Sequence, residues 1–181
     1  MNTRLNLNKW TEYAHSAYQA LGDTVNIRRL AKQSVLSHSI AHYEELRSTY
    51  AESEWPAVLQ ELLTELAKKP LRSETYVSIL ARENLQDELM AHCRRYPAEI
   101  LSLHRHFDQL YSAQVNDLFL LVLRSRANSA SHRGAYRHVC QDLRTYAKAC
   151  GKENAERLKQ ELQNTYRRRP AFLDELSSLR F

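Results

Sequence analysis

The chain has 181 residues, of which 43% are hydrophobic and 26% charged, a composition that is ordinary for a folded domain and argues against intrinsic disorder. It contains only three glycines and four prolines. Because hairpins and long loops need glycine in their turns, this scarcity favours helices joined by short connections. The longest apolar run, Leu118 to Leu123, is much shorter than the ~20 residues of a membrane span. The N-terminus has no apolar signal-peptide core, so we expect a cytoplasmic protein without a membrane segment.

The formal charge of +5 is unevenly distributed. Residues 1–120 carry a net charge of −2, whereas residues 121–181 carry 13 Lys and Arg against 6 Asp and Glu, a net charge of +7. This asymmetry indicates that an acidic partner would bind the C-terminal third. The cysteines Cys93, Cys140 and Cys150 are odd in number and widely spaced within helical patterns, which predicts reduced, buried thiols.

Three amphipathic helices are expected at the N-terminal end. The first covers about 7–21 and ends at Gly22, which supplies a left-handed cap. Asp23 is placed to cap the second helix, which continues to about Val35. Ser37 is expected to open the third, whose apolar positions are Tyr43, Leu46 and Tyr50.

The fourth helix shows the helical period most clearly. Ser53 can cap its start, Pro56 falls in the first turn, where a missing N–H is tolerated, and Pro70 ends it. Its apolar positions recur at intervals of three and four residues, as one buried stripe requires: Trp55, Val58, Leu59, Leu62, Leu63 and Leu66.

The middle of the chain predicts further short helices that begin at Ser73, Asn84 and Pro97. The stretch 111–129 contains no helix breaker and includes the apolar run 118–123. That run alone could be a buried strand, but its unbroken flanks favour a central helix buried on most sides.

Three helices are expected to finish the chain. The first carries an apolar stripe from Tyr136 to Cys150 and ends at Gly151. The second covers about 155–166, and the third starts with Pro170 in its first turn.

These patterns predict an all-α fold of about 10–11 short helices in one helical-repeat domain, residues 1–181. Short links place sequence neighbours side by side as antiparallel pairs, and one pair cannot bury both of its faces, so pairs should stack. We therefore expect an α-solenoid of the tetratricopeptide or HEAT type with a right-handed superhelix. The alternative is an irregular helical bundle.

One group of residues has the spacing of metal ligands. His38, His42 and Glu45 would share a helix face, so they could present three zinc ligands. With eight histidines in the chain such a pairing arises easily by chance, and solvated or capping roles are the favoured interpretation. No Cys-x-x-Cys pattern is present either, so we expect no metal and no cofactor.

No motif commits the chain to a reaction. It lacks a G-x-S-x-G elbow and a glycine-rich phosphate loop, and its carboxylate pairs fall on polar helix faces. We therefore expect a protein that is not an enzyme and has no small-molecule substrate.

The basic C-terminal third is the strongest chemical signal. Arginine binds phosphate or carboxylate through its planar fork, and interleaved tyrosines could stack on bases. The alternative is that these side chains cap helix ends and pair with acidic neighbours. The candidate contacts for nucleic acid or an acidic partner are Arg124, Arg126, Arg133, Arg137, Arg144, Arg167, Arg168 and Arg169.

Three segments of the final fifty or so residues are distinctive, and they begin Ser131-His-Arg-Gly-Ala-Tyr136, Gly151-Lys-Glu-Asn and Thr165-Tyr-Arg-Arg-Arg-Pro170-Ala-Phe-Leu. Together they resemble the end of bacterial SWIM-type zinc-finger proteins. The resemblance implies a cytoplasmic, all-helical repeat tail. The family's zinc motif, Cys-x-Cys followed by Cys-x-His, is absent, so no metal ligand carries over. Either the chain is the C-terminal part of a longer protein, or the zinc finger has been lost.

The resulting expectation is a non-catalytic helical scaffold for protein–protein interaction, an accessory region of a SWIM-type protein whose protein partner the sequence does not identify. The alternative is a nucleic-acid-associated accessory domain that binds through the basic C-terminal face.

Overall fold

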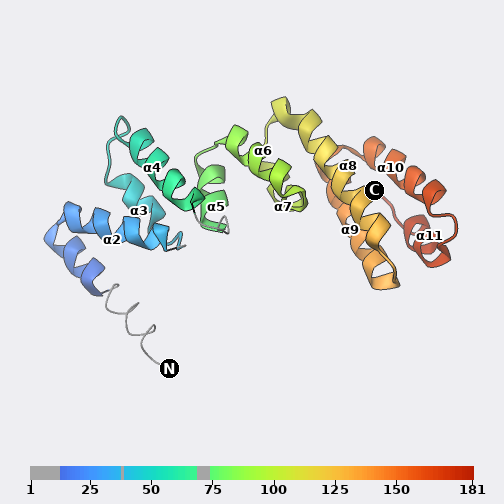
Figure 1. Cartoon of the computed structure of the whole chain (residues 1–181), viewed down its shortest axis with the longest axis horizontal. Helices are drawn as coiled ribbons and strands as arrows, with labels where there is room; N and C mark the ends of the chain where they lie inside the picture. Colours follow the sequence, from blue (N-terminus) through green and yellow to red (C-terminus); the bar gives the residue numbers. More distant parts are fainter. Residues whose placement is uncertain (1–12, 38, 69–73) are drawn as a thin grey trace, which may run out of the picture. The chain divides into compact units, whose positions relative to one another are not determined.

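The computed structural model describes residues 13–37, 39–68 and 74–181, and every regular element in these ranges is helical (Figure 1). The prediction of an all-α fold is therefore confirmed. None of the helices in these ranges has the length and apolar character that a bilayer crossing requires. The chain divides into two compact units, Met1–Glu83 (unit 1) and Asn84–Phe181 (unit 2).

Unit 1 contains a helical stretch over 13–21, followed by four labelled helices. Asp23 caps α2 as predicted, because its side chain accepts a hydrogen bond from the backbone N–H of Asn26. Gly22 has a φ of +66°, the left-handed conformation that the sequence indicated. The helices are α2 (Thr24–Leu36), α3 (Tyr43–Ser48), α4 (Trp55–Ala67) and α5 (Glu74–Arg82).

The expected start of the third helix at Ser37 is wrong. The backbone N–H of Ser37 closes α2 instead, by donating to carbonyls of that helix's last turn. The hydroxyl of Ser39 then accepts from the N–H of Ala41, and such local side-chain bonds compete with helix formation. Helix α3 consequently begins only at Tyr43, with His42 as its N-cap residue.

Helix α4 buries the predicted stripe, except that Val58 is only half-buried. Pro56 lies in the first turn as predicted, but the N-cap residue is Glu54, not Ser53, and no side chain caps the helix. The start of the helix expected over about 7–21 falls outside the described residues, and so do the predictions on His38, Pro70 and Ser73.

Unit 2 begins with short elements and continues with longer helices (Figure 1). Asn84 has a φ of +54°, which a helix cannot contain, so α6 begins at Gln86 rather than at Asn84. Pro97 starts a single 3₁₀ turn instead of a regular α-helix. The elements are α6 (Gln86–Arg95), η1 (Pro97–Glu99), α7 (Ile100–Leu103), η2 (His104–His106), η3 (Gln109–Tyr111), α8 (Ser112–Ser129), α9 (Arg133–Cys150), α10 (Lys152–Thr165) and α11 (Pro170–Ser177).

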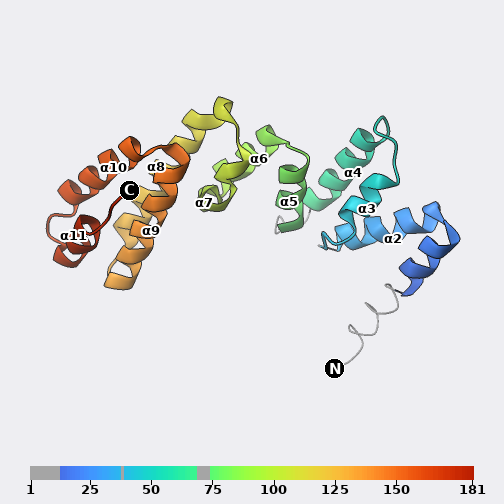
Figure 2. The ribbon, with the colours of Figure 1, turned by 180° about the vertical axis from the view of Figure 1, so that it is seen from behind.

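The apolar run 118–123 is helical, as its flanks indicated, within α8. Leu118, Phe119 and Val122 are buried, but Leu121 is 55% exposed, so α8 is not covered on every side. Helix α9 lies at the centre of unit 2 and packs against α8, α10 and α11 (Figures 1 and 2). Unit 2 has one continuous core, to which α9 contributes Tyr136, Val139, Cys140, Leu143 and Tyr146.

Candidate functional site

Half of the arginines of the basic C-terminal third pair with carboxylates of their own unit. Arg124 of α8 donates two hydrogen bonds of 2.8 Å to the carboxylate of Glu161 on α10. Hydrogen bonding to that guanidinium lowers the pKa of Glu161. Arg126 lies 2.5 Å from the carboxylate of Asp142 on α9. These arginines therefore join neighbouring helices.

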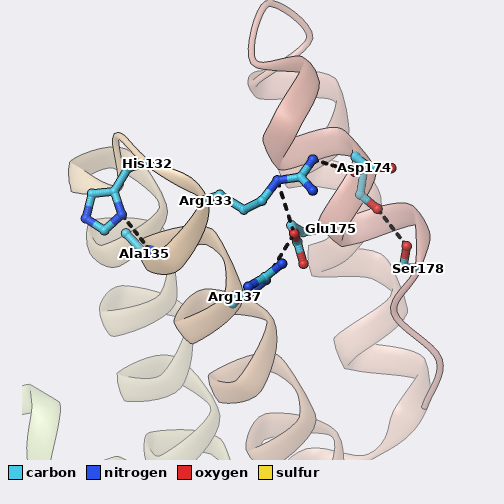
Figure 3. A network of polar contacts seen from close by, with 7 residues as sticks. All are labelled: His132, Arg133, Ala135, Arg137, Asp174, Glu175 and Ser178. Carbon is cyan, nitrogen blue, oxygen red and sulfur yellow. Dashed lines mark hydrogen bonds and ion pairs between the residues drawn. The ribbon is translucent and has the colours of Figure 1, made fainter.

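Arg133 and Arg137 connect the start of α9 to α11 (Figure 3). The Arg133 guanidinium lies between Asp174 at 2.7 Å and Glu175 at 3.5 Å. Arg137, one turn along α9, contacts the same Glu175 carboxylate at 3.3 Å. Beside this network, Nδ1 of His132 accepts the backbone N–H of Ala135 and caps α9.

Arg169 has a different environment, because its guanidinium donates to backbone carbonyls at the end of α8. The distances are 3.0 Å to the oxygen of Ala127 and 2.8 Å to that of Ala130. The same guanidinium lies 4.5 Å from the centre of the Tyr166 ring. Arg167 also bonds a carbonyl, that of Asn164. Arg169 therefore acts as a C-terminal cap for α8, a role that the sequence analysis considered as the alternative.

The paired arginines leave a smaller basic surface. All six acidic residues of 121–181 form ion pairs with Arg or Lys. Arg144 and Arg168 form no ion pair within the described ranges, and the same holds for Lys148 and Lys152, two basic residues that the sequence analysis did not single out. A nucleic-acid contact through the eight arginines stays a prediction.

Unit 2 also contains an open cavity of about 510 Å³ beside α8. Its apolar lining includes Phe107, Ala113 and Val115, and its polar lining includes Asp108 and Asn116. The remaining lining residues come from the same segments and from the junction of α9 with α10: His104, Gln109, Ser112, Ala149, Cys150 and Asn154.

Two features at this cavity bear on what it could bind. Leu110, whose neighbour Gln109 lines the cavity, is 84% exposed. Burial raises the pKa of the Cys150 thiol to about 11, so this sulfur is protonated at neutral pH and is a poor nucleophile. The cavity therefore offers a mixed apolar and polar lining, and its cysteine is not an activated nucleophile.

Unit 1 contains one group of side chains with metal-ligating atoms close together, among the residues that the structure describes: His15, His42 and Glu45. Nε2 of His15 lies 2.5 Å from Oε2 of Glu45, and Nδ1 of His42 lies 3.5 Å from the same oxygen. Two of these residues belong to the predicted set, whereas His38 lies outside the described residues. His15 was missed because it lies on another helix, and no local spacing connects it to His42.

Comparison with known proteins finds no counterpart: no protein-family model, no curated protein and no solved structure matches this chain.

Proposed function

We propose that this chain is a non-catalytic helical scaffold that binds a segment of a partner protein. The observation that carries the proposal is the open cavity beside α8, with Leu110 exposed next to it. Ligand pockets typically combine apolar side chains with a few polar groups, as the lining of this cavity does. The partner segment would place an apolar side chain against Phe107, Ala113 and Val115, and hydrogen-bond to the polar lining.

A peptide-display selection on the full chain tests this proposal. Peptides with an apolar anchor should be enriched, and Ala113→Trp, which fills the cavity, should abolish their binding. Arg168→Ala serves as the control, because Arg168 does not line the cavity. Peptides that bind the wild type and Ala113→Trp equally would contradict the proposal, and so would a selection that enriches no sequence.

The same proposal includes stacking of the helices in antiparallel pairs as an α-solenoid with a right-handed superhelix, in one helical-repeat domain. Short links between amphipathic helices support it. A compact globule of this length has a radius of gyration of about 16 Å, and a solenoid exceeds that value. Small-angle X-ray scattering measures the radius, and a value near that of the compact globule would favour the irregular bundle.

The resemblance to SWIM-type proteins supports an accessory role in a larger cytoplasmic protein, and it stays a prediction. The reading frame that precedes Met1 tests it. A Cys-x-Cys followed by Cys-x-His there would support the family assignment.

The alternative is a nucleic-acid-associated role through the basic face. It is favoured by basic residues that form no ion pair in the described ranges, among them Arg144, Lys148, Lys152 and Arg168. Such binding should weaken steeply as salt rises, because phosphate contacts release counterions. A mobility-shift titration across salt with Arg144→Ala/Arg168→Ala measures it, and unchanged binding by this variant would exclude these two contacts.

A further inference from the structure

His15, His42 and Glu45 bring two imidazoles and one carboxylate to a single point within unit 1. The three ligating atoms all lie within 4.8 Å of one another. His15 belongs to the helical stretch 13–21, His42 is the N-cap residue of α3, and Glu45 lies in the first turn of α3. A ligand held by all three would therefore join two separate helical segments.

The buried nitrogen of His15 is the feature that calls for a ligand. His15 is only 7% exposed, and its Nε2 has no hydrogen-bond partner of acceptable geometry. Glu45 Oε2 lies 2.5 Å away, so the distance fits a hydrogen bond but the direction does not. A misaligned contact is weak, so this approach of Glu45 does not satisfy the His15 nitrogen. An imidazole lone pair and a carboxylate oxygen repel each other, and a cation bound between them would turn this repulsion into attraction.

The spacing of the donors fits a small transition-metal ion. In a tetrahedral zinc site with bonds of about 2.0–2.2 Å, neighbouring ligand atoms are about 3.3–3.5 Å apart. The separation of His42 Nδ1 and Glu45 Oε2, 3.5 Å, already matches this value. The His15–Glu45 pair has to open by about 0.8 Å to reach the same spacing, which a small side-chain rotation supplies.

The second oxygen of Glu45 is held by a supporting residue. Gln19, one turn after His15 on the same helix, donates from Nε2 to Glu45 Oε1 at 2.6 Å. This bond fixes the carboxylate and leaves Oε2 toward the two histidines. Residues behind the ligands of metal sites commonly perform this orienting role.

We propose that His15, His42 and Glu45 form a zinc site with three protein ligands and a fourth position for water or an external donor. Two imidazoles and one carboxylate are a donor set that zinc accepts. The bound ion ties the helical stretch 13–21 to α3 and stabilises unit 1. The site is independent of the cavity in unit 2, so it goes beyond the proposed scaffold function.

The test is a titration of the metal-stripped full chain with Zn²⁺, followed by competition with a chromophoric chelator. The wild type should bind one ion per chain, and Co²⁺ in its place should give the intense visible absorption of a four-coordinate site. Glu45→Gln and His42→Ala should each weaken binding by more than about 100-fold, because even residues behind the ligands contribute about 10–100-fold. Gln19→Ala should weaken zinc binding less, by about 10–100-fold, because Gln19 only orients a ligand.

Two further variants separate this ligand set from the one that the sequence spacing suggests. His15→Ala should abolish binding, whereas His38→Ala should leave it unchanged. Circular dichroism without metal shows which variants fold, and if His15→Ala does not fold, Glu45→Gln and His42→Ala decide the test. Zn²⁺ should also raise the unfolding temperature of the wild type but not of Glu45→Gln. Wild-type binding no tighter than that of Glu45→Gln, or loss of binding in His38→Ala, would overturn the proposal.

Discussion

At the scale of single residues, adjacent side chains of one sequence run have different roles. Arg167, Arg168 and Arg169 are indistinguishable as a basic triplet, yet Arg169 bonds the end of α8 while Arg168 is exposed and forms no ion pair in the described ranges. The sequence could not separate them, because the carbonyls that Arg169 reaches lie about forty residues earlier in the chain. The same holds for Arg124 and Arg133, whose carboxylate partners are 37 and 41 residues away.

Arg169→Ala should therefore destabilise the protein by about 1–3 kcal/mol, since it leaves the carbonyls of Ala127 and Ala130 without their donor. Arg168→Ala is the matched control and should change the free energy of unfolding by less than about 0.5 kcal/mol. Urea denaturation followed by circular dichroism measures both. Equal costs for the two variants would show that the cap does not form in solution.

Glu83 is a second residue that sequence reasoning missed, because nothing about a lone glutamate after α5 indicates a buried partner. Its side chain is 13% exposed and accepts from three donors of two other helices. The distances are 2.8 Å from the Tyr43 hydroxyl, 3.3 Å from Nε of Arg47 and 3.2 Å from Nε1 of Trp55. Burial is the main cause that raises the pKa of the Tyr43 hydroxyl well above its usual value, and the Glu83 carboxylate adds to it. The hydroxyl therefore remains a hydrogen-bond donor at all ordinary pH.

Glu83→Gln should lower the stability of unit 1 by about 1–3 kcal/mol. The new amide N–H₂ group cannot accept a hydrogen bond, so at least one of the three donors loses its acceptor. The cost should be smaller when Tyr43→Phe is already present, since the two residues share a bond. A double-mutant cycle by chemical denaturation measures this coupling, with the exposed Glu52→Gln as control. Additive costs would mean that Tyr43 and Glu83 are not coupled.

At the scale of elements, the sequence predicted helices well wherever a cap or breaker decided the boundary. Asp23, Gly22 and Gly151 mark helix ends as expected, because their backbone preferences act locally. The errors fall at Ser37, Ser53, Asn84 and Pro97, where a start signal was inferred from residue type alone. The metal-ligand cluster lies beyond such reasoning, since it depends on how the helical stretch 13–21 packs on α3.

Gly151 offers a test of one such boundary. Its φ of +95° and ψ of +148° lie in a region that only glycine occupies readily, and an added Cβ would meet no atom within 4 Å. Gly151→Ala should thus cost about 1–3 kcal/mol through backbone strain alone. Gly151→Asn should cost as much, because asparagine tolerates only the left-handed helical region. Thermal unfolding compares them, and full tolerance of asparagine would place Gly151 in the left-handed helical region in solution.

At the scale of the whole molecule, each of the two compact units buries apolar residues of its own. The continuous core of unit 2 extends from Met90 to Leu179 and includes no residue of unit 1. Unit 1 buries its own set, in which Leu46, Leu62 and Leu66 are fully covered. Composition and periodicity identified both sets of apolar residues, but periodicity within one helix does not reveal which helices share a core.

The division into two compact units predicts that a cavity in one unit will affect mainly that unit. Leu143 and Leu62 are both fully buried, in unit 2 and unit 1 respectively, and Leu→Ala at either position should cost about 2–5 kcal/mol. Trp55 is buried in unit 1, so in a Trp10→Phe background its fluorescence reports on that unit, while circular dichroism reports on all helices. Leu143→Ala should therefore shift the dichroism transition to lower urea and leave the fluorescence transition in place.

Leu62→Ala should shift the fluorescence transition, and the exposed Leu121→Ala should shift neither. If Leu143→Ala moved both transitions by the same amount, the units would unfold as one cooperative system, because coincident transitions by different probes are the signature of two-state unfolding. Separate transitions would instead allow the zinc titration to be interpreted as an event of unit 1, since Zn²⁺ should then raise the fluorescence midpoint alone.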